Sequence, residues 1–443
     1  MQNYRIKNFR SIIKAGFLII ILFGILQCSE NATNSEGDNL VVTGTVNLEN
    51  QTDHSGVDIH FYQPAIIDTV LTSINQDYPA IGVQVSQETE FDFINNAPAF
   101  STVSNADGTW KIENLNFGKY NIVARHEDFG FQILHEVETT QNLKLTLKEP
   151  VRLRGFYLSD FTIPEESFVI IEEDVIINTS AKLNVGYGSV LLFKDNAKLE
   201  VKGKYEAFGN SSNYIFLLQE VSTQASSLKL DNVTDVTLSG LVIRHMGVGI
   251  TIRNSQAIKV ENCIFQDNLF ALDIFNSNDI EIKDCILDSN EVAIAGNTSQ
   301  CNISENIIIN TKDYAYEAKN DQYSMLINNV FKNNNISLRM NMGFGFSASN
   351  LSIEKNDFIN NFIHIQIGNT SHPRAVENNF LGSEDFAVIV SAGSETNFIY
   401  DFTKNYWQTF DSLAIANRIR DNNDDQLSGV IDFSDYAQNY ISW

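Results

Sequence analysis

Three side chains of types that can bind a sugar chain occur at the same position of a repeating sequence pattern. Tyr316, Arg339 and Gln366 each stand ten residues after an asparagine that marks the repeat. An aromatic ring, a guanidinium group and an amide in a row would offer stacking, charge and hydrogen bonds. Glycan binding by these three residues is therefore one hypothesis. Scattered surface polarity is the alternative.

The same repeat position does not offer a catalytic set. Lyases need a Lys or Arg base beside carboxylates, and glycoside hydrolases need converging carboxylates. The position holds one acid, Asp273, and one base, Arg339, three repeats or roughly 14 Å apart if each repeat is one strand spacing. We therefore predict no catalytic residues. A polysaccharide lyase or glycoside hydrolase stays the alternative, because a slip of one residue in the columns would hide a site.

Metal ligands are not expected either. The acidic run Asp421–Asp425 lacks the alternating D-x-D-x-D-G spacing and the downstream glutamate of a calcium loop. A solvated turn is the favoured interpretation, and Ca²⁺ binding is the alternative. The histidines fit no metal signature. We therefore expect neither a metal site nor a cofactor.

The elements that would position these side chains follow from the repeat itself. A segment of the form Asn or Cys, any residue, then Phe, Ile or Leu recurs at intervals near 22 residues between positions 263 and 405, with Trp in the apolar place of the last copy. Short strands at this period indicate one coil of a parallel β-helix per repeat. Apolar residues recur three positions before and nine and eleven positions after each anchor, so that they would stack as internal ladders about 4.8 Å apart.

The anchor residues themselves are predicted to be structural. An inward asparagine at a coil corner can bond backbone groups that the turn leaves unpaired, and stacked copies can bond each other. Cys263 and Cys285 occupy the same column, where buried thiols are favoured over a disulfide. The predicted asparagine ladder comprises Asn306, Asn329, Asn356, Asn378 and Asn405.

Upstream of the repeat, Phe168–Leu218 resembles the opening coils of pectin-lyase-like right-handed β-helix proteins, and the chain's end from Asn405 resembles their terminal cap. The resemblance implies an all-β fold with a β-helix over 150–443: opening coils at 151–221, repeats at 236–408 and a cap at 409–443. This fold hosts lyases, hydrolases, adhesins and spacers, so it says little about function.

Residues 40–149 alternate as strands do and contain the turn signal Asp107-Gly108. The order GTV, DIHFY, ADGTWKIENLNFGKYNIVAR resembles the carboxypeptidase regulatory-like domain, a transthyretin-like β-sandwich. Residues 63–100 are longer than the usual connection. They would pack either on their own domain or on the neighbouring one.

Residues 1–27 have a basic start without acids, an apolar stretch and Cys28 at its end. This resembles a bacterial lipoprotein signal in which Cys28 is lipidated, although Gln27 replaces the usual small residue. An uncleaved signal anchor is the alternative. The acidic tether at 28–39 is similar to surface-export signals of Bacteroidota lipoproteins. We therefore expect an exported protein, anchored by lipid at the outer membrane or cell surface.

Charge limits the partners. The chain carries 55 acidic and 30 basic residues, for a net charge of −25, and loss of residues 1–27 would remove four basic residues and make it −29. Such acidity argues against nucleic acid and anionic lipid surfaces as partners. A polysaccharide or another cell-surface component stays open. The sequence thus favours a non-catalytic surface lipoprotein that presents a rigid face.

The lipid anchor has a direct test. If Cys28 carries the lipid, Cys28→Ser should move the protein from the membrane fraction to the soluble fraction of exported proteins. Unchanged partitioning on fractionation would refute lipidation at Cys28.

Overall fold

The computed structural model describes residues 40–443, apart from 140–141, 195, 212, 220–225, 341–348, 369, 393–395 and 397. Residues Asn39–Trp443 form one compact unit. The predicted leader, Cys28 and the tether lie outside the described residues. Within the described part of the chain, no helix is both long enough and apolar enough to cross a membrane.

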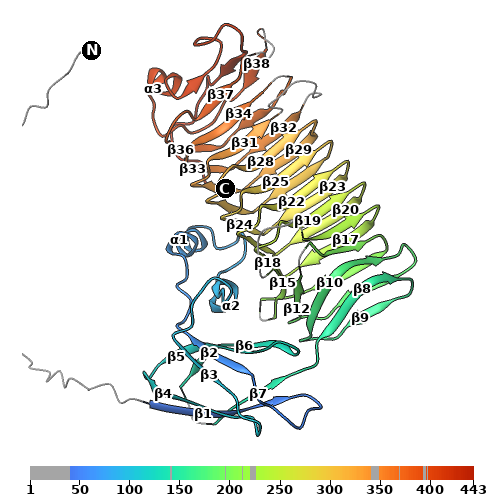
Figure 1. Ribbon diagram of the computed structural model, residues 1–443. Coiled ribbons are helices and arrows are strands. Elements are labelled where there is room, and N and C mark those ends of the chain that lie inside the picture. Colours follow the sequence, from blue (N-terminus) through green and yellow to red (C-terminus); the bar gives the residue numbers. More distant parts are fainter. Residues whose placement is uncertain are drawn as a thin grey trace, which may run out of the picture. The chain divides into compact units, whose positions relative to one another are not determined.

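The first domain consists of two packed sheets (Figure 1). One sheet has the order β4-β1-β7, and the other has the order β3-β2-β5-β6. Their inner faces share a core that includes Phe61, Trp110 and Tyr120. The Asp107-Gly108 turn precedes β4, and Gly108 has a φ of +79°, which suits glycine. The strands are β1 (Leu40–Leu48), β2 (Asp58–Tyr62), β3 (Phe100–Val103), β4 (Thr109–Leu115), β5 (Lys119–His126), β6 (Gly130–Glu138) and β7 (Leu143–Leu147).

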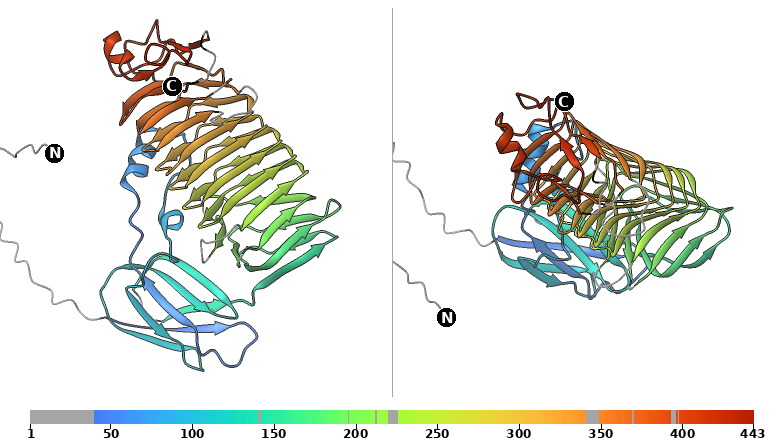
Figure 2. Two further views of the ribbon diagram at one scale, coloured as in Figure 1. Left: turned by 45° about the horizontal axis from the view of Figure 1, so that its top comes forward. Right: turned by 90° about the horizontal axis from the view of Figure 1, so that it is seen from above.

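The rest of the chain winds into stacked coils, and equivalent strands of successive coils pair in parallel (Figures 1 and 2). Each complete coil contributes one strand to each of three ladders. Two long strands, β8 (Val151–Tyr157) and β10 (Phe168–Ile177), open the stack, and β10 pairs with the first strands of both ladder 1 and ladder 2.

Ladder 1 contains β12 (Val190–Phe193), β15 (Ile215–Gln219), β18 (Leu241–Arg244), β21 (Ile264–Gln266), β24 (Ile286–Asp288), β27 (Ile307–Ile309), β30 (Val330–Lys332), β33 (Asp357–Asn361) and β36 (Asn379–Ser383). Ladder 2 contains β13 (Lys198–Val201), β16 (Ser227–Asp231), β19 (Val248–Arg253), β22 (Phe270–Phe275), β25 (Val292–Asn297), β28 (Tyr314–Lys319), β31 (Ile336–Met340), β34 (Ile363–Ile367), β37 (Val388–Val390) and β39 (Ile419–Arg420). Ladder 3 contains β9 (Phe161–Ile163), β11 (Lys182–Val185), β14 (Lys204–Phe208), β17 (Thr234–Ser239), β20 (Gln256–Glu261), β23 (Asn278–Lys283), β26 (Cys301–Ser304), β29 (Gln322–Ile327), β32 (Asn350–Glu354) and β35 (Arg374–Val376).

The interior of the coils is a stack of like side chains. Phe331, Phe358 and Phe380 are fully buried, and their ring centroids lie 5.0 and 5.3 Å apart, close to the strand spacing. Cys263 and Cys285 are buried thiols in the same column, and both are free. The predicted fold class, an all-β protein with a right-handed parallel β-helix, is confirmed.

The corners between ladders 3 and 1 are closed by the anchor asparagines. The residue before each anchor has positive φ, as at Asn328 and Lys355, which turns the chain sharply. The buried asparagine that follows bonds its neighbours: Asn356 Oδ1 accepts from the backbone N–H and from Nδ2 of Asn329 at 3.0 and 2.9 Å. Asn356 Nδ2 in turn donates to the carbonyl of Leu326 at 2.9 Å. Such bonds run from Cys285 through Asn306, Asn329, Asn356 and Asn378 to Asn405.

The other two corners carry polar ladders that the sequence analysis missed. Between ladders 1 and 2, the backbone N–H of Asn268 donates to Asn290 Oδ1 at 3.0 Å, and the N–H of Asn334 donates to Asn361 Oδ1 at 2.8 Å. Between ladders 2 and 3, the N–H of Ser255 donates to Ser277 Oγ at 3.1 Å. At these corners a polar side chain therefore satisfies backbone groups of the coil beside it.

Residues 63–99, here called the strap, leave the sandwich and pack on the outer side of ladder 1 (Figures 1 and 2, blue). The strap contains α1 (Thr69–Asp77) and α2 (Gln87–Glu90), which sequence analysis did not foresee. Asp68 begins α1 by accepting from the backbone N–H of Val70, and Ser86 and Thr89 form a capping box at α2. Both alternatives are realised: Leu71 and Ile74 pack on the neighbouring β-helix, whereas Phe91 and Phe93 pack on the strap's own sandwich.

The chain's end covers the last coil. β38 (Ile399–Asp401) pairs with β40 (Val430–Asp432), and a short helix, α3 (Ser412–Ala416), lies between them in the chain. Ile419 and Arg420 form β39 and extend ladder 2. Trp407 is fully buried and closes the stack of rings beyond Phe380, at 4.5 Å between centroids.

The asparagine ladder should dominate local stability. Asn356→Ala would leave the buried N–H of Asn329 and the carbonyl of Leu326 without partners, so we expect a loss of about 3 kcal/mol in the free energy of unfolding. Chemical denaturation should show it. Asn335→Ala, at an exposed asparagine one coil away, should change stability by less than about 0.5 kcal/mol. Equal effects of the two variants would contradict a structural role for the ladder.

Candidate functional site

The outer side of ladder 1 is not available to a ligand. Its outward residues form an apolar stripe that includes Val242, Ile264 and Ile286, and the strap buries this stripe with Leu71 and Ile74. At the far end, Tyr78 of the strap stacks on Trp443 with ring centroids 5.6 Å apart. Strap and chain end together cover this face.

Charged groups fasten the strap to ladder 1. Arg244 is buried and donates to the carbonyls of Thr89 and Phe91, the latter at 2.8 Å. His245 Nε2 lies 2.9 Å from Asp92 Oδ2 of the strap. Burial raises the pKa of Glu90 to about 7. These ionisable groups are clustered, but they are sealed against the strap, so they tie two segments together and do not form an open site.

The outer side of ladder 3 is a lattice of ion pairs. Lys259 lies 3.1 Å from Glu281 on the next coil. Lys283 stands opposite Glu261 in the register of the two strands, and its Nζ lies 3.1 Å from Glu305 on the following coil. Arg374 bridges two coils at 3.0 Å from Glu354 and 2.9 Å from Asp401. Exposed pairs of this kind help to set register and keep the surface solvated, and contribute little binding chemistry.

Ladder 2 presents a partly open outer face with mixed chemistry, here called the ladder-2 face, in which Val292, Ile363 and Glu317 are buried and other residues are exposed. One outward column runs through Phe270, Val292, Tyr314, Ile336 and Ile363. The next outward column runs through Thr251, Asp273, Ala295, Glu317, Arg339, Gln366 and Ile389. Phe270 is 37% exposed and Phe275 is 43% exposed. Aromatic, charged and amide side chains therefore alternate along one surface.

The placement of Tyr316 on this face was wrong. Tyr316 pairs with Ile294 and Leu338, lies in the inward column and is fully buried. The cause is one extra residue in that coil: the first strand residue follows the corner by two positions at Asn290 but by three at Thr311. The outward residue of this coil is Glu317.

Arg339 and Gln366 do stand side by side on the ladder-2 face. The Arg339 guanidinium carbon lies 4.2 Å from the ring centre of Tyr314, a cation–π contact. Burial lowers the pKa of Arg339, although the group remains charged at neutral pH. Tyr314 thus supplies the aromatic ring that the sequence analysis assigned to Tyr316. Glycan binding by Arg339 and Gln366 stays a prediction.

The corrected register adds a second carboxylate. Asp273 and Glu317 share the outward column with Ala295 between them, so their strands are two spacings or about 10 Å apart. Asp273 lies 3.4 Å from Arg253, and Glu317 lies 2.7 Å from Lys319. Counting from the repeat asparagines gives only one acid in this column, because the count is off by one residue in this coil and assigns Glu317 to the inward apolar column. The signal that could have found it is the longer interval between Thr311 and Tyr314.

A groove borders the ladder-2 face at the corner between ladders 1 and 2. Its volume is about 660 Å³. Lys312, Asn335 and Phe362 come just before the ladder-2 strands of three successive coils, and Phe362 is 42% exposed. The other lining residues are Thr311, Asn333, Asn334, Asn360, Gly382, Ser383 and Glu384. Amides beside an exposed ring continue the chemistry of the ladder-2 face.

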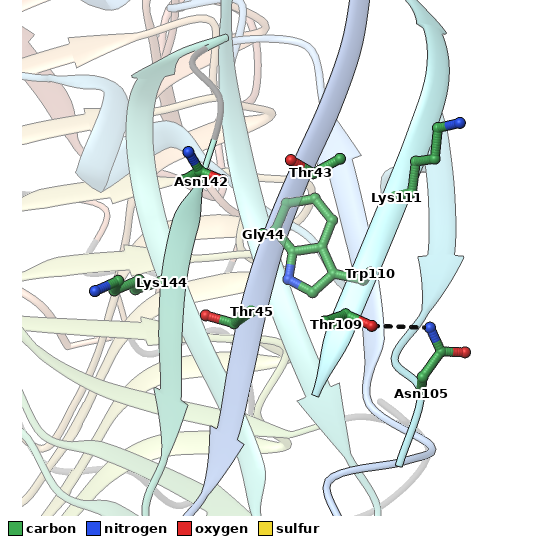
Figure 3. A pocket seen from close by; sticks show the side chains of 9 residues that line it. All are labelled: Thr43, Gly44, Thr45, Asn105, Thr109, Trp110, Lys111, Asn142 and Lys144. Carbon is green, nitrogen blue, oxygen red and sulfur yellow. Dashed lines mark hydrogen bonds between the residues drawn. The ribbon is translucent and has the colours of Figure 1, made fainter. Parts of the chain in front are cut away.

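A second pocket, of about 460 Å³, lies on the sandwich (Figure 3). Gly44 is required there because a Cβ would meet the ring of Trp110 at 2.2 Å. Lys111 and Lys144 point away from one another in Figure 3, and Lys111 is paired with Glu113. The residues around this pocket therefore do not converge on one point.

The described residues contain no group of three or more His, Cys, Asp or Glu side chains that could hold a metal ion. In the acidic run, Asp421 Oδ1 and Oδ2 accept from the backbone N–H groups of Asn423 and Ile431, both at 2.9 Å. Asp425 Oδ1 accepts from the N–H of Leu427 at 3.1 Å. The carboxylates of this turn are thus engaged in its own hydrogen bonds.

Stacked parallel ladders with polar corners define a right-handed parallel β-helix protein. Residues 209–412, less than half of the chain, match the family model described as periplasmic copper-binding protein (NosD). No curated protein sequence matches the chain significantly.

Solved structures with a similar fold include carbohydrate-active enzymes. DFA-IIIase from Arthrobacter chlorophenolicus A6 is 9% identical, with 60% of this chain and 88% of that chain covered and a TM-score of 0.36. The Yersinia enterocolitica family 28 exopolygalacturonase is 9% identical, with 81% and 85% covered and a TM-score of 0.33. Alginate lyase from Paenibacillus sp. str. FPU-7 is 10% identical, with 45% and 88% covered and a TM-score of 0.28. Likeness at this level carries no argument about function.

The interior beneath the ladder-2 face holds a titratable group. Tyr316 donates its hydroxyl to Asp321, and Ser324 Oγ donates to the same carboxyl at 2.6 Å. Asp321 is fully buried, and burial raises its pKa from 3.8 to about 7. Folding therefore favours the protonated acid.

Stability should consequently fall as pH rises. Between pH 4 and 7 the native state keeps a proton on Asp321 that the unfolded chain releases, so up to about 4 kcal/mol is lost across this window. Asp321→Asn mimics the protonated acid, so the variant should match the parent protein near pH 4 and be more stable at pH 8. Glu90 titrates in both proteins, so its contribution to the pH dependence of stability cancels when the two profiles are compared. Parallel pH profiles of unfolding free energy for the two proteins would contradict this assignment.

Proposed function

We propose that the protein is an exported carbohydrate-binding β-helix protein whose ladder-2 face, with the bordering corner groove, holds an extended glycan chain. The observation that carries this proposal is the contrast between the three outer faces. In the described residues, ladder 1 is covered and ladder 3 carries ion pairs between successive coils, whereas ladder 2 exposes Phe270 and Phe275 beside amide and charged side chains.

The geometry of the face suits an extended sugar chain. Successive coils repeat at about 4.8 Å, similar to the length of one hexose unit in an extended polysaccharide. Phe270 and Tyr314 lie two coils apart in one column, where each ring can stack on a sugar face. Arg339 and Gln366 add hydrogen-bond donors in the adjacent column. One coil would thus contact about one sugar unit.

Export and anchoring belong to the same proposal. The matching family's description names a periplasmic protein, and the leader ending at Cys28 fits export with a lipid anchor at the outer membrane or cell surface. The family's description also names copper. Copper sites in proteins use thiolate, thioether or imidazole ligands. The described residues do not fit such a site, because they hold no cluster of ligands and the thiols of Cys263, Cys285 and Cys301 are buried.

We favour binding over catalysis because the two outward carboxylates are each held by a cation. A glycosidase needs one carboxylic acid that holds a proton beside a second, ionised carboxylate, whereas Asp273 and Glu317 are each engaged in an ion pair, with Arg253 and Lys319 respectively. The second candidate is an inverting glycoside hydrolase. One observation favours it: the spacing of about 10 Å between the strands of these two acids is near the upper end of the range for that mechanism.

The binding proposal is tested on a polysaccharide panel with the purified protein. A retained glycan should lose affinity about tenfold in Arg339→Ala, because a guanidinium contact contributes on the order of 1–2 kcal/mol. Arg374→Ala, the same change on ladder 3, should leave affinity unchanged. Equal losses in the two variants, or no retained glycan, would overturn the proposal.

The same incubations separate the second candidate. Binding without new reducing ends supports the non-catalytic role. Release of reducing ends that is lost in both Asp273→Asn and Glu317→Gln would establish the hydrolase instead.

A further inference from the structure

A separate pocket lies between the sandwich and the first coils of the β-helix, here called the seam pocket. Its volume is about 400 Å³, within the range of small-molecule sites, which often occur between domains. β6 and β7 of the sandwich, the starts of β10, β12 and β15, and Glu88 of the strap line it. It therefore uses different elements from the ladder-2 face.

One side of the seam pocket is a wall of aromatic rings. Phe131 of the sandwich meets Phe168 of the β-helix with ring centroids 4.6 Å apart. Phe216 and Phe129 line the pocket beside them. Phe131 also contacts Phe93 of the strap at 4.7 Å, which fixes the position of the wall. A planar ring of a ligand would find apolar contacts here.

Polar side chains also line the pocket, among them the charged Glu88, Lys148 and Glu166. Glu88 and His135 are the two that carry the argument. Glu88 is partly buried, its Oε1 accepts from the backbone N–H of Tyr214 at a long 3.4 Å, and burial raises the pKa of Glu88. His135 packs edge-on against Phe91, and its Nδ1 is buried without a hydrogen-bond partner among the described residues. Burial lowers the pKa of His135, so the imidazole is neutral at pH 7. An unpaired buried polar atom costs about 1–3 kcal/mol, which an occupant could relieve.

We propose that the seam pocket binds a small molecule that carries one aromatic ring and a protonated amine. The ring packs against Phe131, Phe168 and Phe216, and the ammonium group binds the carboxylate of Glu88. A purely apolar void between two domains would not require a carboxylate and an unpaired imidazole in its lining. The sign of the charge on the ligand follows from the charged residues of the lining, because two acids, Glu88 and Glu166, stand against one base, Lys148.

Two probes with the same ring and opposite charge test the proposal. Benzylamine and benzoate are titrated into the purified protein and followed by saturation-transfer NMR. Benzylamine should bind at least tenfold more tightly than benzoate. Equal binding of the two probes, or no saturation transfer to benzylamine at its highest soluble concentration, would overturn the proposal.

Variants locate the site. Glu88→Gln, which keeps an oxygen acceptor for Tyr214, should weaken benzylamine binding at least fivefold. Glu165→Gln is the matched control, because Glu165 is outside the lining. Equal effects of both variants would refute the role of Glu88. The comparison of the two probes on the unmodified protein remains decisive if Glu88→Gln lowers thermal stability.

Discussion

The fold depends on one constraint: each coil turns three times through buried corners, where backbone groups cannot reach water. Residues with positive φ make the turns, and the inward side chain that follows bonds the backbone of the neighbouring coil. Because a buried unpaired N–H or carbonyl is costly, each corner is stable only when another coil stacks on it. The asparagine and serine ladders are therefore what makes the stack cooperative, and the apolar interior fills the space that they frame.

Stacking also explains why the three outer faces differ. A ladder repeats the same direction of side chains every 4.8 Å or so, so any outward preference becomes a stripe along the β-helix. On ladder 1 the stripe is apolar and had to be covered, which the strap and the chain end do. On ladder 3 the stripe contains oppositely charged residues of successive coils that form ion pairs, so this face is solvated without a covering segment. The ladder-2 face keeps rings such as Phe270 and Tyr314 beside charges without a covering segment in the described chain, and it is therefore the face on which we place ligand binding.

Sequence alone predicted the β-helix because the residues that mark each repeat have a regular period. Asn306, Asn329 and their equivalents recur with apolar neighbours at fixed offsets. It misplaced Tyr316 because a column counted from the anchor ignores a residue inserted after the next corner, between Thr311 and Tyr314. The buried Thr311 interrupts the second asparagine column, which hid that corner as a reference point. The helices of the strap were not predicted, because their apolar residues pack against ladder 1, which is distant in the sequence. The periodicity of the strap's own sequence does not reveal such a contact. Seam pocket and ladder-2 face both depend on which segments meet in space, and spacing along the chain does not encode this.

The most direct test of the central claim, that ladder 2 is the ligand face, is hydroxyl-radical footprinting with and without a retained polysaccharide. We expect protection of Phe270, Tyr314 and Phe362 on the ladder-2 face and its groove. Tyr323 and Met325 on ladder 3, which are 68% and 45% exposed, should be modified equally in both states. Protection of Tyr323 and Met325, with Phe270 and Tyr314 unchanged, would contradict the account.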